Sequence, residues 1–111
     1  MPTTKPRQSE YLYLTTSGRN SGLPREIEIW FVKRDEFFYV FAEHFEDAQW
    51  VKNIRRQPRV ECRVGGSSFH ATARVLDERA DESLWREVQQ LAREKYGWGD
   101  GLPVEIVPDR S

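Results

Sequence analysis

Apolar and polar residues alternate with a period of two along several short segments of this chain, a pattern typical of half-buried β-strands. In the clearest case, Glu-Ile-Glu-Ile at residues 26–29, Ile27 and Ile29 share one face with Phe31. Residues 37–42 are almost continuously apolar, which predicts a central strand covered on both sides. We expect strands at about residues 11–15, 24–32, 37–42, 60–64, 69–75 and 103–107.

Two segments carry the spacing of an amphipathic helix instead. The first is expected over about residues 48–57 and ends before Pro58. Glu46 or Asp47 is placed to cap or favour its N-terminus, because the free amides there attract negative charge. The second begins near Leu84 and is expected to end near Tyr96-Gly97. The apolar faces of the two helices are formed by Trp50, Val51 and Ile54, and by Leu84, Trp85, Val88, Leu91 and Ala92.

Five or six short strands joined mainly by hairpins, with only two helices, indicate a mainly β (α+β) fold built as an antiparallel barrel. Gly65-Gly66 is a strong signal for a tight turn between the fourth and fifth strands. A chain of 111 residues is long enough for one hydrophobic core. We expect a single domain over residues 9–111, preceded by a flexible arm at residues 1–8.

The charge balance and the cysteine count exclude several classes of protein. The net charge is −1, which opposes a nucleic-acid-binding module. The single cysteine, Cys62, rules out an internal disulfide and a cysteine-rich zinc site; we expect no metal, and a buried thiol. No apolar run is long enough to cross a bilayer, so we expect a cytoplasmic protein without membrane insertion.

The loop between the first two strands is the part of the chain that most resembles a site. It contains two glycines, which permit positive φ, and several hydroxyl side chains that can bond amides or a ligand oxygen. Arg19 and Arg25 bracket it, and a guanidinium matches phosphate or carboxylate geometry. The chemistry favours an anion site, but on these residues alone a solvated hairpin loop is the commoner interpretation.

Leu14 to Arg25 resembles the opening signature of the deazaflavin-dependent nitroreductase family, L-T-T-x-G-R-K-S-G-x-P-R. Trp50 to Val60 is similar to its W-x-x-N-(L/I)-x-x-x-P-x-V element, and residues 64–75 are similar to its G-G-x-x-x-x-A-x-x-V hairpin. Leu102-Pro103-Val104 looks like its closing strand. The resemblance implies the split barrel shared by flavin and deazaflavin enzymes of the pyridoxamine-phosphate-oxidase type.

The resemblance also implies a cofactor, reduced deazaflavin (coenzyme F(420)), whose acidic tail the basic loop would hold. Arg19 and Arg25 would then contact the phosphate, and Trp50 and Asn53 would line or brace the pocket beside the ring system. The hydroxyls or amides would come from Thr16, Ser17, Gly18 and Ser21. The cofactor would carry the hydride chemistry, while the protein supplies orientation and electrostatics.

Two departures separate this chain from the family pattern. Asn20 replaces the usual lysine and removes one positive charge from the loop. Where the family has S-K-G-G after the third strand, this chain has an acidic segment without glycine. Glu43, Glu46 and Asp47 would repel an anionic cofactor unless they point away from it.

Two side chains near the implied pocket are catalytic candidates, namely His44 and Tyr96. His44 could donate a proton, because imidazole titrates near neutral pH, although a lone histidine in a loop is more often merely solvated. Tyr96, with Trp98, falls where the family places aromatics over substrate, and ordinary packing explains both equally well. A second basic cluster has an ordinary explanation as helix-end and strand-edge charge, but if it faces the same cleft as Arg19 and Arg25 it could instead attract an extended acidic tail or a nucleotide. It comprises Lys52, Arg55, Arg56, Arg59 and Arg63.

The function implied by the resemblance is hydride transfer from reduced F(420) to a quinone, a nitro compound or a similar planar acceptor. An FMN-dependent oxidoreductase on the same fold is one alternative, because one phosphate would tolerate the loss of lysine at position 20. A non-catalytic protein that binds a flavin-like or lipid-like ligand is another, favoured by the acidic segment. Exposed aromatics such as Trp30 or Phe37 would make a homodimer reasonable.

Overall fold

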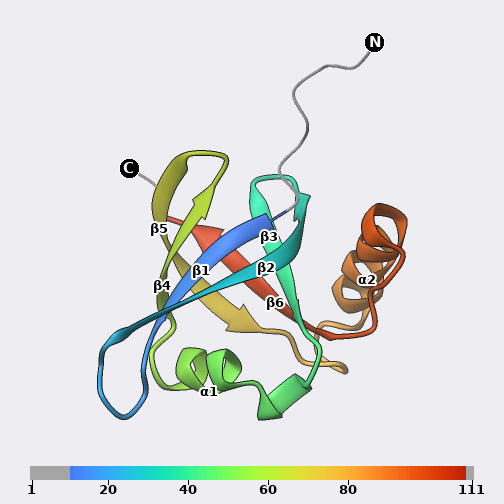
Figure 1. Ribbon diagram of the computed structural model, residues 1–111. Helices are drawn as coiled ribbons and strands as arrows, with labels where there is room; N and C mark the ends of the chain where they lie inside the picture. The colour runs from blue at the N-terminus through green and yellow to red at the C-terminus, as the bar shows by residue number, and fades with distance from the viewer. Residues whose placement is uncertain (1–10, 110–111) are drawn as a thin grey trace.

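The computed structural model describes residues 11–109, which form a six-stranded antiparallel barrel with two α-helices (Figure 1). The strands are β1 (Tyr11–Ser17), β2 (Pro24–Arg34), β3 (Phe37–Ala42), β4 (Arg59–Val64), β5 (Ser67–Val75) and β6 (Leu102–Pro108). They close in the order β1-β2-β3-β6-β5-β4. The expected barrel is confirmed, and the arm expected at residues 1–8 lies outside the described residues.

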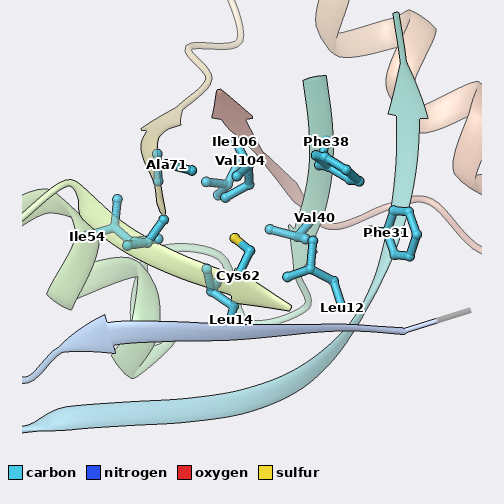
Figure 2. Close-up of a cluster of buried hydrophobic side chains, with 12 residues drawn as sticks. Leu12, Leu14, Phe31, Phe38, Val40, Ile54, Cys62, Ala71, Val104 and Ile106 are labelled. Atoms are coloured by element: carbon cyan, nitrogen blue, oxygen red, sulfur yellow. The ribbon is translucent and has the colours of Figure 1, made fainter. Parts of the chain in front are cut away.

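The interior of the barrel is filled by the inward faces of all six strands (Figure 2). Ile27, Ile29 and Phe31 line it from β2, as the alternation predicted. The thiol of Cys62 points into this cluster, and burial raises its pKa to about 12. The predicted buried cysteine is therefore confirmed, and it is poorly suited to act as a nucleophile.

Strand β3 is buried on both faces because a second apolar layer covers the outside of the barrel. Phe38 and Val40 point inward, whereas Tyr39 and Phe41 join an outer cluster with Val88 and other residues of helix α2 (Glu82–Tyr96). This explains the nearly continuous apolar run at residues 37–42. Helix α2 ends at Gly97, which has φ of 80° and so adopts the left-handed conformation that glycine favours.

Helix α1 (Gln49–Arg56) lies below the barrel, beside the β1–β2 hairpin (Figure 1). The expected cap by Glu46 or Asp47 is wrong, because the N-cap residue is Ala48, without a side-chain cap. Asp47 and Glu46 lie one and two residues before the N-cap, in the 3₁₀ turn η1 (Phe45–Asp47). Glu46 instead accepts hydrogen bonds from Arg55 at 2.9 and 2.7 Å.

The β1–β2 hairpin extends well beyond the neighbouring strand. β1 and β2 pair from Tyr11 opposite Trp30 to Ser17 opposite Pro24. β2 pairs with β3 only over Phe31–Arg34, so residues 24–30 lack a strand partner on that side within the described chain. The hairpin therefore has one end inside the barrel wall and one end that projects beside α1 (Figure 1).

Candidate functional site

The turn at the projecting end of the hairpin, residues 18–23, is called the glycine loop below. The Gly18 amide donates to the Leu23 carbonyl at 2.8 Å, and the Gly22 amide donates to the Gly18 carbonyl at 2.7 Å. Gly22 has φ of 75°, which explains the need for glycine there. A β-carbon on Gly18 would lie 2.9 Å from Ser21 Oγ and 3.3 Å from the Leu23 carbonyl oxygen, so the loop is closed tightly around this residue.

Asn53 of helix α1 ties the glycine loop to the barrel. Its side chain is buried, with 4% exposed, and its Nδ2 donates to Thr16 Oγ1 at 3.1 Å. Its Oδ1 accepts from the Arg19 backbone amide at 3.2 Å and from the Arg19 guanidinium at 3.0 Å. One amide side chain therefore fixes both the position of the loop and the direction of Arg19.

The two arginines of the loop keep their charge available to a ligand. Arg19 is held only by neutral oxygens, since its second contact is with Gln49 Oε1 at 2.7 Å. Arg25 forms no hydrogen bond or ion pair within residues 11–109, and its Nε lies 3.5 Å from the position of a β-carbon on Gly18. Two guanidinium groups without carboxylate partners, beside a tight turn, fit an anionic group such as a phosphate.

The other residues expected around the anion differ in their availability. Ser17 and Ser21 lie at the loop, where Ser21 Oγ accepts from the Leu23 amide at 3.1 Å. The Thr16 side chain is 1% exposed and bonded to Asn53, so it braces the loop from inside. Trp50 is half-buried and packs against both apolar clusters from α1. The structure thus brings the loop and Asn53 together and leaves Trp50 in a packing position.

A second feature lies at the other end of the hairpin, where a cleft of about 540 Å³ opens between β1, β2, the end of β3 and helix α2. We call it the aromatic cleft. Its aromatic lining is Tyr11, Trp30, Phe41, Tyr96 and Trp98. The sequence signal for it was weak, because these five side chains come from four separate segments of the chain.

Tyr96 has a structural role in this cleft as well as a lining one. Its ring stacks on Trp30 with centroids 4.4 Å apart and an interplanar angle of 4°. Its hydroxyl donates to the Phe31 carbonyl at 2.8 Å and accepts from the Phe31 amide at 3.2 Å. Tyr96 and Trp98 therefore pack against the outer apolar cluster and also line the cleft, and the position over substrate stays a prediction.

The charged lining of the aromatic cleft is acidic. Glu28 and Glu43 line it, and both side chains are exposed. Glu28 accepts a hydrogen bond from the Tyr13 hydroxyl at 2.7 Å, which raises the pKa of Tyr13. Of the acids expected to repel the cofactor, Glu43 faces this cleft, whereas Glu46 is paired with Arg55, whose hydrogen bonds lower the pKa of Glu46.

His44 is exposed in the turn between β3 and η1 and does not line the aromatic cleft.

The second basic cluster is largely occupied by ion pairs. Arg59 binds Asp109 through two bonds of 2.8 Å, and Arg63 lies 3.4 Å from Glu26. Within residues 11–109, no cluster of His, Cys, Asp and Glu could hold a metal ion. No helix in this part of the chain is long and apolar enough to span a membrane.

The pairing register gives the separation of the two features. Six residue steps lie between the Tyr11–Trp30 pair and the Ser17–Pro24 pair, or about 20 Å of strand. The near wall of the cleft, Glu28, is only three residues from Arg25 along β2, or about 10 Å between α-carbons. A ligand that bridges the two features must therefore be extended.

Comparisons with known proteins give the same relationship as the motifs. The family model of F(420)H(2)-dependent quinone reductases matches residues 3–107. A search of curated proteins gives no match. Among solved structures, an F(420)-H(2)-dependent reductase has a TM-score of 0.69 at 24% identity, with 95% of this chain and 99% of that chain covered.

Two further solved structures share the fold. A Listeria innocua protein named for pyridoxamine 5′-phosphate oxidase has a TM-score of 0.73 at 16% identity, covering 91% of this chain and 85% of that one. A protein solved as a domain-swapped dimer has a TM-score of 0.65 at 24% identity, covering 94% and 84%. These likenesses confirm the split-barrel fold. Because the family model spans nearly all of the sequence, the chain belongs to the F(420)H(2)-dependent quinone reductase family.

Proposed function

We propose that this protein is an oxidoreductase that moves hydride from reduced coenzyme F(420) to a planar acceptor such as a quinone or a nitro compound. The observation that carries the proposal is the guanidinium of Arg19, which Asn53 and Gln49 hold in place without neutralising its charge. A guanidinium that is held in place and keeps its full charge is preorganised to bind an anion.

The residues that would hold the cofactor are those of the glycine loop and its support. Arg19 and Arg25 would bind its phosphate, and the hydroxyls of Ser17 and Ser21 or the amide of Gly18 would add hydrogen bonds. Asn53 would act as a positioning residue through Arg19, with Thr16 behind it. The bound deazaflavin would supply the hydride, and the chain would supply orientation and the exclusion of water.

The proposal does not need a protein acid or base of unusual pKa. Both hydrogen-bonding capacities of the Tyr96 hydroxyl are used by the backbone of Phe31, so we assign it to positioning of the cleft wall. His44 is too exposed and too unsupported by neighbours to be given a proton-transfer role. The reaction would then depend on placement of the cofactor beside the acceptor.

The test is a fluorescence titration of the purified protein with F(420) and, separately, with FMN. We expect F(420) to bind, and Arg25→Ala to raise its Kd about tenfold or more, since a charge-assisted hydrogen bond is worth about 1.5–3 kcal/mol. Arg63→Ala, which removes the same charge from a residue already paired with Glu26, should change Kd less than threefold. Equal effects of the two substitutions, or preference for FMN, would contradict the proposal.

A homodimer in the cytoplasm is a further part of the proposal. Apolar side chains with more than a third of their surface exposed lie at several points of the barrel, including Leu23 at 57% and Phe37 at 37%. A second copy would cover such surface favourably. Light scattering on a size-exclusion column, at several protein concentrations, measures whether the mass is that of one chain or two.

A further inference from the structure

The charge of the aromatic cleft favours a cationic ligand over an anionic one. Its charged lining side chains, Glu28 and Glu43, are both carboxylates, and among residues 11–109 no lysine or arginine lines it. Glu43 stands at the start of the acidic segment Glu43–Asp47, which carries three carboxylates within five residues. The cleft therefore combines π faces with negative charge, the two features that attract an organic cation.

Resting on the proposed function, we infer that the acceptor bound in the aromatic cleft is a planar organic cation, such as a heteroaromatic iminium or phenothiazinium. The cleft volume of about 540 Å³ is in the range that takes a molecule of two to four fused rings. The stacked Trp30–Tyr96 pair offers a flat aromatic wall. Indole and phenol rings attract cations through their quadrupoles, and carboxylates add to that attraction.

The neighbouring cation does not change the sign of the cleft. Lys95 lies 5.0 Å from the centroid of the Tyr96 ring, but its Nζ donates to the Phe31 carbonyl at 2.9 Å and lies 4.0 Å above the Phe31 ring. It borders the adjoining groove over Phe31 and Phe38 rather than the aromatic cleft. On the opposite side, Arg93 is paired with Asp100 at 2.9 Å.

Hydride transfer to such a cation balances without a further reactant. The cation would gain two electrons and one proton as hydride, for which a bound reduced deazaflavin would be the reductant, and a second proton from the reductant would pass to solvent. The hydride forms a new N–H or C–H bond on the cation, whose positive charge is lost. The neutral product no longer interacts with Glu28 and Glu43 as a cation, so the same two side chains that favour binding of the acceptor favour release of the product.

The experiment measures binding without the cofactor, so that its failure is distinct from failure of the F(420) titration. Quenching of tryptophan fluorescence is followed with methylene blue, a planar cation; with menadione, a neutral quinone; and with anthraquinone-2-sulfonate, a planar anion. We expect methylene blue to bind at least tenfold more tightly than the sulfonate. The double variant Glu28→Gln/Glu43→Gln should reduce this ratio to less than threefold, and added salt should weaken dye binding to the original protein.

The matched control changes the net charge equally away from the cleft. Glu36→Gln/Glu78→Gln removes two exposed carboxylates that do not line it, and the binding ratio should stay within twofold of the original. Equal lowering of the ratio by both double variants would show a general charge effect and overturn the inference. Tighter binding of menadione or of the sulfonate than of methylene blue would overturn it as well, whatever the result with F(420).

Discussion

The two ends of the β1–β2 hairpin carry opposite charge and hold it in opposite ways. At the glycine loop, Arg19 is fixed by neutral oxygens and Arg25 is unpaired within the described chain. At the aromatic cleft, Glu28 and Glu43 lie exposed beside stacked rings. The charge at the loop favours an anion and the charge at the cleft favours a cation, so the two ends are suited to different ligand groups.

The two ends also differ in how their side chains are held. The loop end is built from residues that hold each other through buried hydrogen bonds, centred on Asn53. The cleft end depends on exposed side chains such as Glu43, which can change without disturbing the barrel. Substitutions at the first end should therefore affect stability and cofactor affinity together, whereas those at the second should affect acceptor choice alone.

The largest effect is expected from Asn53→Ala, which removes the hydrogen bonds that hold the glycine loop against helix α1. Loss of the side chain leaves the buried Thr16 hydroxyl and the Arg19 amide without their partner. We expect the free energy of unfolding to fall by about 2–3 kcal/mol, because unsatisfied buried groups cost about 1–3 kcal/mol each. Urea denaturation measures the stability, and an F(420) titration below the transition should show affinity reduced more than tenfold.

Asn53→Asp distinguishes the hydrogen bonds made by residue 53 from the positive charge of Arg19. The carboxylate can still accept from Arg19 and from the Thr16 hydroxyl, so stability should stay within about 1 kcal/mol of the original. Its negative charge would neutralise Arg19, however, and F(420) affinity should fall as much as in Asn53→Ala. If affinity instead followed stability in the two variants, the charge of Arg19 would not be what binds the anion.

The next largest effect is expected at the cleft, from Trp30→Ala. This removes one half of the stacked pair with Tyr96 and one wall of the cleft. Methylene blue affinity should fall about tenfold, since a cation–π contact and a stacked wall are each worth about 1 kcal/mol. F(420) affinity should change less than threefold. Parallel titrations with methylene blue and F(420) check this. Equal losses of affinity for the two ligands would mean that the glycine loop and the aromatic cleft act as one site.

A smaller effect is expected from Gly18→Ala, which opens the glycine loop without removing charge. The new methyl group would lie 2.9 Å from Ser21 Oγ and 3.3 Å from the Leu23 carbonyl oxygen, so the serine side chain must rotate and the carbonyl must shift by a few tenths of an ångström. We expect F(420) affinity to fall about threefold to tenfold, with stability lowered by about 1 kcal/mol. Gly22→Ala is the control, because it meets no atom within 4 Å but strains a positive φ. It should affect stability more than affinity.

The fold could be predicted from the sequence because each strand carries its own local signal. The alternation at residues 26–31, the Gly65-Gly66 turn and the Gly97 helix end all appear in the structure as expected. The site could be predicted only in part. Arg19 and Asn53 meet at 3.0 Å although they are 34 residues apart, and it was the family motif rather than any periodicity that linked them.

The aromatic cleft and the helix cap show what local patterns cannot supply. Tyr11, Trp30 and Trp98 meet through barrel closure, which depends on the register of several strand pairs at once. The missed cap at α1 has a similar cause, since Glu46 binds Arg55, nine residues further along the chain. Where a side chain has two possible partners, the tertiary structure decides which one it binds. Local propensity alone predicted the wrong partner for Glu46.

The smallest effect is expected from Glu46→Gln, which tests whether the acidic segment opposes the cofactor. The hydrogen bonds from Arg55 lower the pKa of Glu46, so the stability from this pair is present above the ordinary pKa of a glutamate and lost as pH falls through the lowered value. Because both side chains are more than half exposed, the loss at neutral pH should be below about 0.5 kcal/mol. F(420) affinity should change less than twofold, since the charge of Glu46 is already balanced by Arg55. A gain in affinity of fivefold or more would mean that Glu46 repels the cofactor in spite of its partner, and the negative charge of this chain would then limit cofactor binding as well as acceptor choice.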